Sequence, residues 1–161
     1  MRTPALAPAL LGALLVAGCT TGGEVAAPSP PAPAADGPCD DATFGAIESV
    51  VAAQLDDMSA GDWAAALEHA TSGFREQVGP NDLEQIITES FPVVADNAEH
   101  LAAHCTVQGD AARLAVQVTD TAGADQALVY LLELEEGGWQ IAGAVPADGS
   151  GPGTGDPGLQ A

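Results

Sequence analysis

The sequence contains no lysine, and its only arginines are Arg2, Arg75 and Arg113, whereas 23 residues are aspartate or glutamate. The formal net charge at pH 7 is −20. Nucleic-acid-binding proteins need clustered Lys and Arg side chains to neutralise phosphates, and anionic lipid headgroups attract the same kind of cluster. The composition therefore excludes nucleic acid as a partner and excludes a basic patch as a means of membrane attachment.

Motifs that carry enzymatic chemistry or bind metals are also missing. There is no GxSxG nucleophile motif, no phosphate-binding glycine loop, no dinucleotide fingerprint and no CxxC pair. His100 and His104 are expected on one face of a strand, with Glu99 adjacent and His69 remote in sequence. Zinc needs three or four ligands, and this spacing fits no zinc signature. We therefore expect no metal and no cofactor, with the two histidines on a solvated strand face.

No apolar run is long enough to cross a membrane. Residues 5–16 are mostly apolar and follow Arg2, but about twelve residues extend only roughly 18 Å as a helix, against a hydrocarbon core of about 30 Å. Such a run is typical of the hydrophobic region of a secretory signal peptide.

The four residues that end this run, Val16-Ala17-Gly18-Cys19, resemble the lipobox of bacterial lipoprotein signal peptides. The resemblance implies that residues 1–18 are removed as a signal peptide and that Cys19 becomes lipidated. The protein would then be anchored to the cell membrane on its extracytoplasmic side, because two acyl chains give stable attachment. The alternative is an ordinary secretory signal in which Cys19 is incidental.

Cys39 and Cys105 are the remaining cysteines. An even pair in an exported domain predicts a disulfide, and the alternative is two unpaired buried thiols. Residues 19–38 are rich in proline and alanine and are expected to form an extended tether. Residues 147–161 are mostly Gly, Pro and Asp and are expected to be disordered. The folded domain is therefore predicted to span residues 39–146.

The hydrophobic period within this domain changes once. Between residues 41 and 91, apolar residues recur at helical spacing, with Asp40 or Asp41 and then Asp62 as N-caps, and with a capping box from Asn81 to Glu84 before the stop at Pro92. Beyond Pro92 the period is two, and glycine-containing turns separate the runs. The pattern predicts an α+β domain in which helices are followed by a curved antiparallel sheet.

The alternation also predicts which side chains form the core. Leu101 is grouped with Cys105 and Val107, and Val145 with Trp139 and Ile141. The residues expected between sheet and helices are Ile47, Val51, Leu55, Ile86, Ile87, Leu114, Val116, Val118, Leu128, Tyr130 and Leu132. Residues 127–133 are apolar on both faces, so this strand is either covered on both sides or forms a homodimer through its outer face.

Several segments support a more specific assignment. Ala53-Gln54-Leu55, Gly61-Asp62 with the following alanines, residues 130–133 and the closing segment 138–143 (Gly-Trp-Gln-Ile-Ala-Gly) resemble an uncharacterised bacterial family. That family lies within the nuclear-transport-factor-2-like, or cystatin-like, superfamily of cone-shaped domains. The resemblance implies the cone fold over residues 43–145. Its relatives include isomerases, cyclases, dehydratases and binding modules, so the fold does not select a function.

Three residues are candidates for lining a pocket inside the cone. Tyr130 is either an oxyanion donor or a core residue, Gln54 either points into a cavity or bonds the backbone, and Trp63 either fills the core or walls a cavity mouth. We expect a membrane-tethered, non-catalytic domain that binds a small apolar ligand or a partner protein. The alternative is an isomerase- or cyclase-type enzyme in which Tyr130 acts with a carboxylate base.

Overall fold

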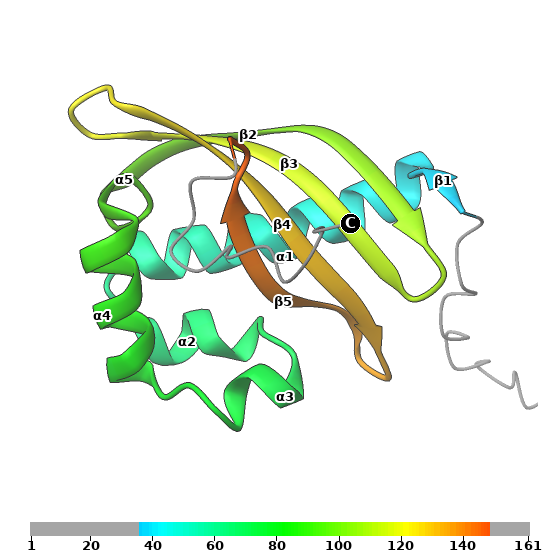
Figure 1. Ribbon diagram of the computed structural model, residues 1–161, viewed down its shortest axis with the longest axis horizontal. Coiled ribbons are helices and arrows are strands. Elements are labelled where there is room, and N and C mark those ends of the chain that lie inside the picture. Colours follow the sequence, from blue (N-terminus) through cyan, green and yellow to red (C-terminus); the bar gives the residue numbers. More distant parts are fainter. Residues whose placement is uncertain (1–35, 149–161) are drawn as a thin grey trace, which may run out of the picture.

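The computed structural model describes residues 36–148 (Figure 1). The signal peptide, the lipidation at Cys19, the tether up to residue 35 and the tail from residue 149 are predictions that fall outside the described residues. Within residues 36–148, no helix is long and apolar enough to span a membrane.

The first two helices begin where the sequence predicts. α1 (Asp41–Ser59) starts after Asp40, whose carboxylate accepts a hydrogen bond from the Thr43 N–H at 2.7 Å. α2 (Trp63–Glu68) starts after Asp62, whose carboxylate accepts one from the Ala65 N–H at 3.0 Å. Each carboxylate satisfies an N–H group that lacks a partner within its helix.

The next three helices depart from the prediction in two places. α3 (Ser72–Arg75) is the expected single turn, but α4 (Pro80–Ser90) begins at Gly79-Pro80, so the capping box predicted at Asn81 is wrong. Instead the Gly79 N–H donates to the Asp82 carboxylate at 3.0 Å. Pro92 ends α4 as expected and also begins α5 (Pro92–Ala95), because proline fits the first turn of a helix as well as it stops one.

The sheet follows the chain order without crossovers. It contains β1 (Gly37–Pro38), β2 (Asn97–Gln108), β3 (Ala111–Asp120), β4 (Asp125–Glu135) and β5 (Gly138–Pro146), all antiparallel to their neighbours. The meander of β2 to β5 is as predicted, whereas β1 forms from residues that the sequence places at the end of the tether. The observed α+β fold, with helices followed by a curved antiparallel sheet, is the one that the sequence predicts.

A bulge at Ala103 changes the alternation of β2. Ala102 pairs with Val116 and His104 with Ala115, so Ala103 has no counterpart on β3. The extra residue exchanges the two faces of the strand. His100 and His104 therefore lie on opposite faces, and the prediction that they share one is wrong. Leu101, grouped with Cys105 from the sequence, lies on the outer face and is 69% exposed.

A second bulge in β5 has the same effect. Leu131 pairs with Gly143 and Leu132 with Ile141, which leaves Ala142 unpaired. Val145 consequently points to the outer face, where it is 37% exposed, instead of joining Trp139 and Ile141 in the core. A further register shift between Asn97 and Glu99 leaves Ala98 unpaired. Bulges bend a strand and increase its twist, so these irregularities contribute to the curvature of the sheet (Figure 1).

The core lies between α1 and the concave face of the sheet. Among the residues predicted for it, all but two are buried: Ile47, Val51, Leu55, Leu114, Val116, Val118, Leu128, Tyr130 and Leu132. Ile87 is partly buried, and Ile86 is 43% exposed, so its assignment to the core is wrong. Leu83 is the buried residue of α4 instead, because α4 lies over an opening in the core.

Cys39 and Cys105 form a disulfide, with their Cα atoms 5.4 Å apart. The Cys39 N–H also donates to the Cys105 carbonyl oxygen at 3.2 Å. The bond joins the residue before the N-cap of α1 to β2, the first long strand of the sheet. It is the pairing that the sequence predicts for these two residues.

Candidate functional site

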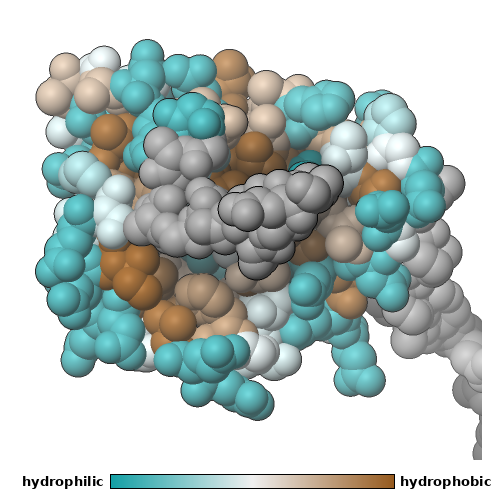
Figure 2. Space-filling view, viewed as in Figure 1, coloured by the Kyte–Doolittle hydropathy of each residue, from teal (hydrophilic) through white to brown (hydrophobic). Residues whose placement is uncertain are grey.

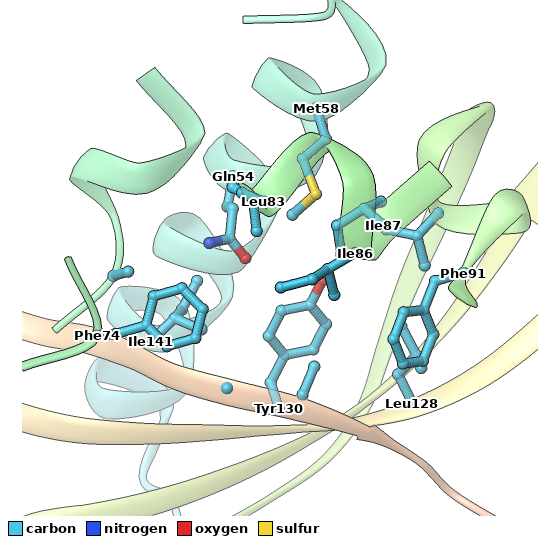
Figure 3. Close-up of a pocket in the computed structure, with 14 residues that line it drawn as sticks. Gln54, Met58, Phe74, Leu83, Ile86, Ile87, Phe91, Leu128, Tyr130 and Ile141 are labelled. Atoms are coloured by element: carbon cyan, nitrogen blue, oxygen red, sulfur yellow. The ribbon is translucent and has the colours of Figure 1, made fainter. Parts of the chain in front are cut away.

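A cavity of about 180 Å³ lies between α4 and the concave face of β4 and β5. Its walls are almost wholly apolar (Figure 3). The lining residues are Gln54, Met58, Ala70, Phe74, Leu83, Ile86, Ile87, Phe91, Val94, Leu128, Tyr130, Ile141, Gly143 and Ala144. Figure 2 shows hydrophobic surface beside α4, on the side of that helix toward β5, where this cavity approaches solvent.

The short helix α3 contributes Phe74 to the cavity wall, and polar contacts hold the helix there. Both the N–H and the hydroxyl of Ser72 donate to one carboxylate oxygen of Glu135, at 3.0 Å each. The Arg75 guanidinium donates to the carbonyl oxygens of Glu68 at 2.9 Å and Ala70 at 2.8 Å. These bonds tie α3 to the β4–β5 turn and to the end of α2, so the wall is built from several elements.

Tyr130 is the only tyrosine of the chain, and it lies on β4 with 2% of its surface exposed. Its hydroxyl points into the cavity (Figure 3) and has no hydrogen-bond partner among residues 36–148. Burial disfavours the charged phenolate and raises the pKa of Tyr130 well above its ordinary value of 10.0. The side chain is therefore a neutral phenol that can donate a hydrogen bond.

Gln54 reaches the cavity from α1 and is 5% exposed. Its Nε2 donates to the Ala66 carbonyl oxygen at 3.2 Å, which fixes the orientation of the amide. The carbonyl oxygen is then directed to the cavity side, as Figure 3 shows. The sequence left open whether Gln54 faces a cavity or bonds the backbone, and in the structure it does both.

The structure brings Gln54 and Tyr130 to one cavity and leaves the third candidate elsewhere. Trp63 begins α2 and packs, partly buried, against the core without lining the cavity. No aspartate or glutamate lines the cavity either. The nearest approach to a catalytic pair in the described residues is His69 with Asp57, whose Nε2 and Oδ2 atoms lie 3.0 Å apart. These two residues are outside the cavity lining.

No set of three or more His, Cys, Asp or Glu side chains within residues 36–148 is arranged to hold a metal ion. The bulge at Ala103, which puts His100 and His104 on opposite faces, removes the one pair of histidines that the sequence had placed together. What the described residues offer is an apolar cavity with one hydroxyl and one amide oxygen.

Residues 40–154 match a protein-family model described as a domain of unknown function, DUF4864. The chain belongs to the DUF4864 family. The match covers α1 through β5, so the cavity of this DUF4864 domain is formed entirely by residues within the matched segment. No curated protein matches the chain.

Solved structures with a similar backbone fold have low sequence identity to this DUF4864 domain. A SEC-C motif containing protein from Rhodopseudomonas palustris is 13% identical with a TM-score of 0.47, covering 63% of this chain and 78% of the other. An NTF2-like protein of unknown function from Silicibacter pomeroyi is 23% identical with a TM-score of 0.45, covering 63% and 92%. A candidate NTF2-like transpeptidase from Campylobacter jejuni is 14% identical with a TM-score of 0.45, covering 59% and 96%.

Sequence reasoning missed most of the cavity lining in this DUF4864 domain. Phe74 lies in a four-residue helix, and Phe91 is both the C-cap of α4 and the N-cap of α5. The available signal was the pair Ile86-Ile87. Adjacent residues on a helix point about 100° apart, so two adjacent apolar residues in a short helix indicate a wide apolar face. Such a face is too wide to be buried entirely by contact with one neighbouring element.

Proposed function

We propose that this chain is a membrane-tethered, non-catalytic exported domain whose cone binds a small apolar ligand. The observation that carries the proposal is the cavity beneath α4, with its apolar walls and its volume of about 180 Å³. An apolar cavity of roughly 150 Å³ in another protein stays dry and accepts benzene. A cavity of this size therefore suits a molecule with a single ring or a short aliphatic chain.

The absence of a carboxylate from the cavity lining supports binding over catalysis. An isomerase or cyclase that uses Tyr130 as an oxyanion donor needs a general base within hydrogen-bonding reach of the same substrate. The lining contains no aspartate or glutamate, and the amide of Gln54 is not a base. The enzymatic alternative has no observation in its favour among residues 36–148.

Binding is tested with toluene and with a variant that fills the cavity. Because Tyr130 is the only tyrosine, ring-labelled tyrosine gives one set of NMR signals that reports on the cavity alone. We expect toluene to shift these signals in a saturable manner. Ala144→Leu, which extends a side chain into the cavity, should abolish the shift.

Ala98→Leu is the matched control, because it adds the same side chain at an exposed position of β2. It should leave the toluene-induced shift unchanged. If the chemical shifts of Tyr130 in the natural chain do not change at toluene concentrations up to the solubility limit of toluene, the cavity does not bind apolar molecules and the proposal fails.

The membrane attachment in this proposal rests on Val16-Ala17-Gly18-Cys19 and on the net charge of −20. A chain so acidic is repelled by anionic headgroups, whereas two acyl chains on Cys19 would hold it without any basic patch. The native protein should sediment with membranes, and Cys19→Ala should accumulate as an unprocessed precursor. Mass spectrometry that finds the mature N-terminus anywhere other than Cys19 would contradict the assignment.

The outer face of the sheet supports a homodimer as part of the same proposal. Its centre is formed by Leu101, Ala115, Gln117, Val129, Leu131 and Val145, none of them acidic. In a chain with 23 acidic residues, two copies repel each other least where both present an uncharged surface. Leu101 and Val145 are among the few large hydrophobic side chains exposed within the described residues.

Sedimentation velocity tests the homodimer. The natural chain should sediment as a dimer, and Leu101→Asp combined with Val145→Asp should produce a monomer, because both changes place charge at the proposed contact. A chain that remains strictly monomeric at high concentration would rule out this interface while leaving the cavity proposal intact.

A further inference from the structure

The cavity contains two oxygen atoms whose hydrogen-bonding capacity the protein does not use. The Tyr130 hydroxyl and the Gln54 amide oxygen have no partner among residues 36–148, although Tyr130 is 2% and Gln54 5% exposed. No side-chain nitrogen or oxygen in this part of the chain is both fully enclosed and without a partner. Both oxygens must therefore be reachable from the cavity, as their directions in Figure 3 indicate.

The two oxygens have opposite hydrogen-bonding roles, one as a donor and one as an acceptor. Tyr130 is held as a neutral phenol and can donate. The Gln54 amide presents its oxygen, an acceptor, to the cavity, because its nitrogen donates to the Ala66 carbonyl oxygen on the other side. A bound molecule thus needs an acceptor for Tyr130 and a donor for Gln54. A hydroxyl group is the smallest group that supplies both.

The lining also determines the charge of the occupant. None of the fourteen lining residues is charged, and burying a carboxylate or an ammonium group without a partner is strongly unfavourable. An acid or an amine of the right size is therefore rejected, and the remaining walls favour hydrocarbon.

We infer that the cavity selects uncharged one-ring or short-chain molecules that carry a hydroxyl group, recognised by the Tyr130 hydroxyl and the Gln54 amide oxygen. This inference rests on the proposed function, since it names the chemical class of the ligand for the same cavity. It adds a polar recognition element to a site that is otherwise selective only for size and hydrophobicity.

The test compares 4-methylphenol, toluene and 4-methylbenzoate, which share a ring and differ in one substituent. Calorimetric titration of the full chain measures the ratio of the 4-methylphenol affinity to the toluene affinity. Tyr130→Phe removes only the hydroxyl and should lower this ratio about tenfold, since a hydrogen bond left unmade in an enclosed site corresponds to roughly that factor. The benzoate should not bind either form.

A second variant and a control separate recognition from folding. Gln54→Met keeps the length of the side chain and should also lower the ratio, while retained toluene affinity shows that the cavity is intact. Thr106→Val removes a hydroxyl from β2 outside this cavity and should leave the ratio unchanged.

The outcomes distinguish this inference from the proposed function. If toluene and 4-methylphenol both bind and Tyr130→Phe leaves their ratio unchanged, water satisfies the two oxygens and the inference is overturned, while the apolar cavity stands. Binding of 4-methylbenzoate as tightly as 4-methylphenol would likewise overturn it. If none of the three molecules binds, the proposed function itself fails.

Discussion

Above about pH 10, the folded domain should lose stability through a single side chain. The chain has no lysine, arginine stays protonated below about pH 12, and Cys39 and Cys105 are bonded to each other. Tyr130 is therefore the one group in the described residues whose charge state can change between these limits. Burial raises its pKa in the folded state above the ordinary value of 10.0, which applies when the chain is unfolded.

The sign of the effect depends on the proton bound in each state. Below pH 10 both states hold the phenolic proton, and the stability is unaffected. Above it the unfolded chain releases the proton while folded Tyr130 keeps it, so the free energy of unfolding falls by about 1.4 kcal/mol per pH unit. At about pH 11 the loss is roughly 1.4 kcal/mol, which lowers the Tm of a domain of this size by about 6 °C.

Two measurements check this reasoning. Thermal unfolding between about pH 9 and 11 should show the decline in the natural chain and not in Tyr130→Phe, which has no proton to release. Tyrosinate absorbance should appear only as the chain unfolds. A tyrosinate signal with a midpoint near pH 10 while the domain remains folded would refute the burial of the hydroxyl and with it the geometry of the cavity.

Three further changes test the supports of the cone. Reducing the Cys39–Cys105 disulfide, which links positions 66 apart, should lower stability by about 4 kcal/mol in the chain-entropy model; reductant should not affect a Cys39→Ser, Cys105→Ser variant. Asn97→Ala should cost about 2 kcal/mol by denaturant unfolding, because its buried amide donates to carbonyls of α1 and α5 at 2.9 and 3.0 Å, and a loss below about 0.5 kcal/mol would contradict that role. Asp62→Ala should cost about 1 kcal/mol by removing the N-cap of α2, and unchanged stability would show that water replaces the cap.

Local chemistry explains which elements the sequence could predict. Asp40 and Asp62 are N-caps because a short carboxylate can bond the free N–H groups of the first turn, and this depends only on neighbouring residues. The strands are predictable for a similar reason, since alternation is a property of each segment. The order of helices and strands results from these local signals.

The errors in assigning strand residues to a face have a common cause in the curvature of the sheet. Ala103 and Ala142 resemble ordinary strand residues, yet each is the extra residue of a bulge, and each reverses the faces of the residues after it. Nothing in the sequence near them marks the reversal, because the position of a bulge depends on where the strand must bend to curve the sheet around α1. Leu101 and Val145 are consequently assigned to the wrong face when the sequence is considered alone.

The cavity could be predicted only in part. Gln54 and Tyr130 are recognisable as candidates because a polar group on an apolar face needs an explanation. Both side chains line one cavity because α4 is separated from the sheet. The spacing of apolar residues within residues 80–90 does not predict this separation. Ile86 is assigned to the core for that reason, whereas it lies at the edge of an opening.

The disulfide also determines how a mechanical load enters this domain. A pull on the chain before residue 36 first reaches Asp36, which accepts a hydrogen bond from the Gly109 N–H. It then reaches Gly37 and Pro38, which pair with β2 alone and can detach without breaking the pairing of the other strands. At Cys39 the force passes through the sulfur atoms into Cys105 of β2, so α1 is shielded although it follows immediately in sequence. A domain held to a surface by its N-terminal side is thereby loaded through a covalent bond to its sheet, and the helix that carries Gln54 stays in place under tension.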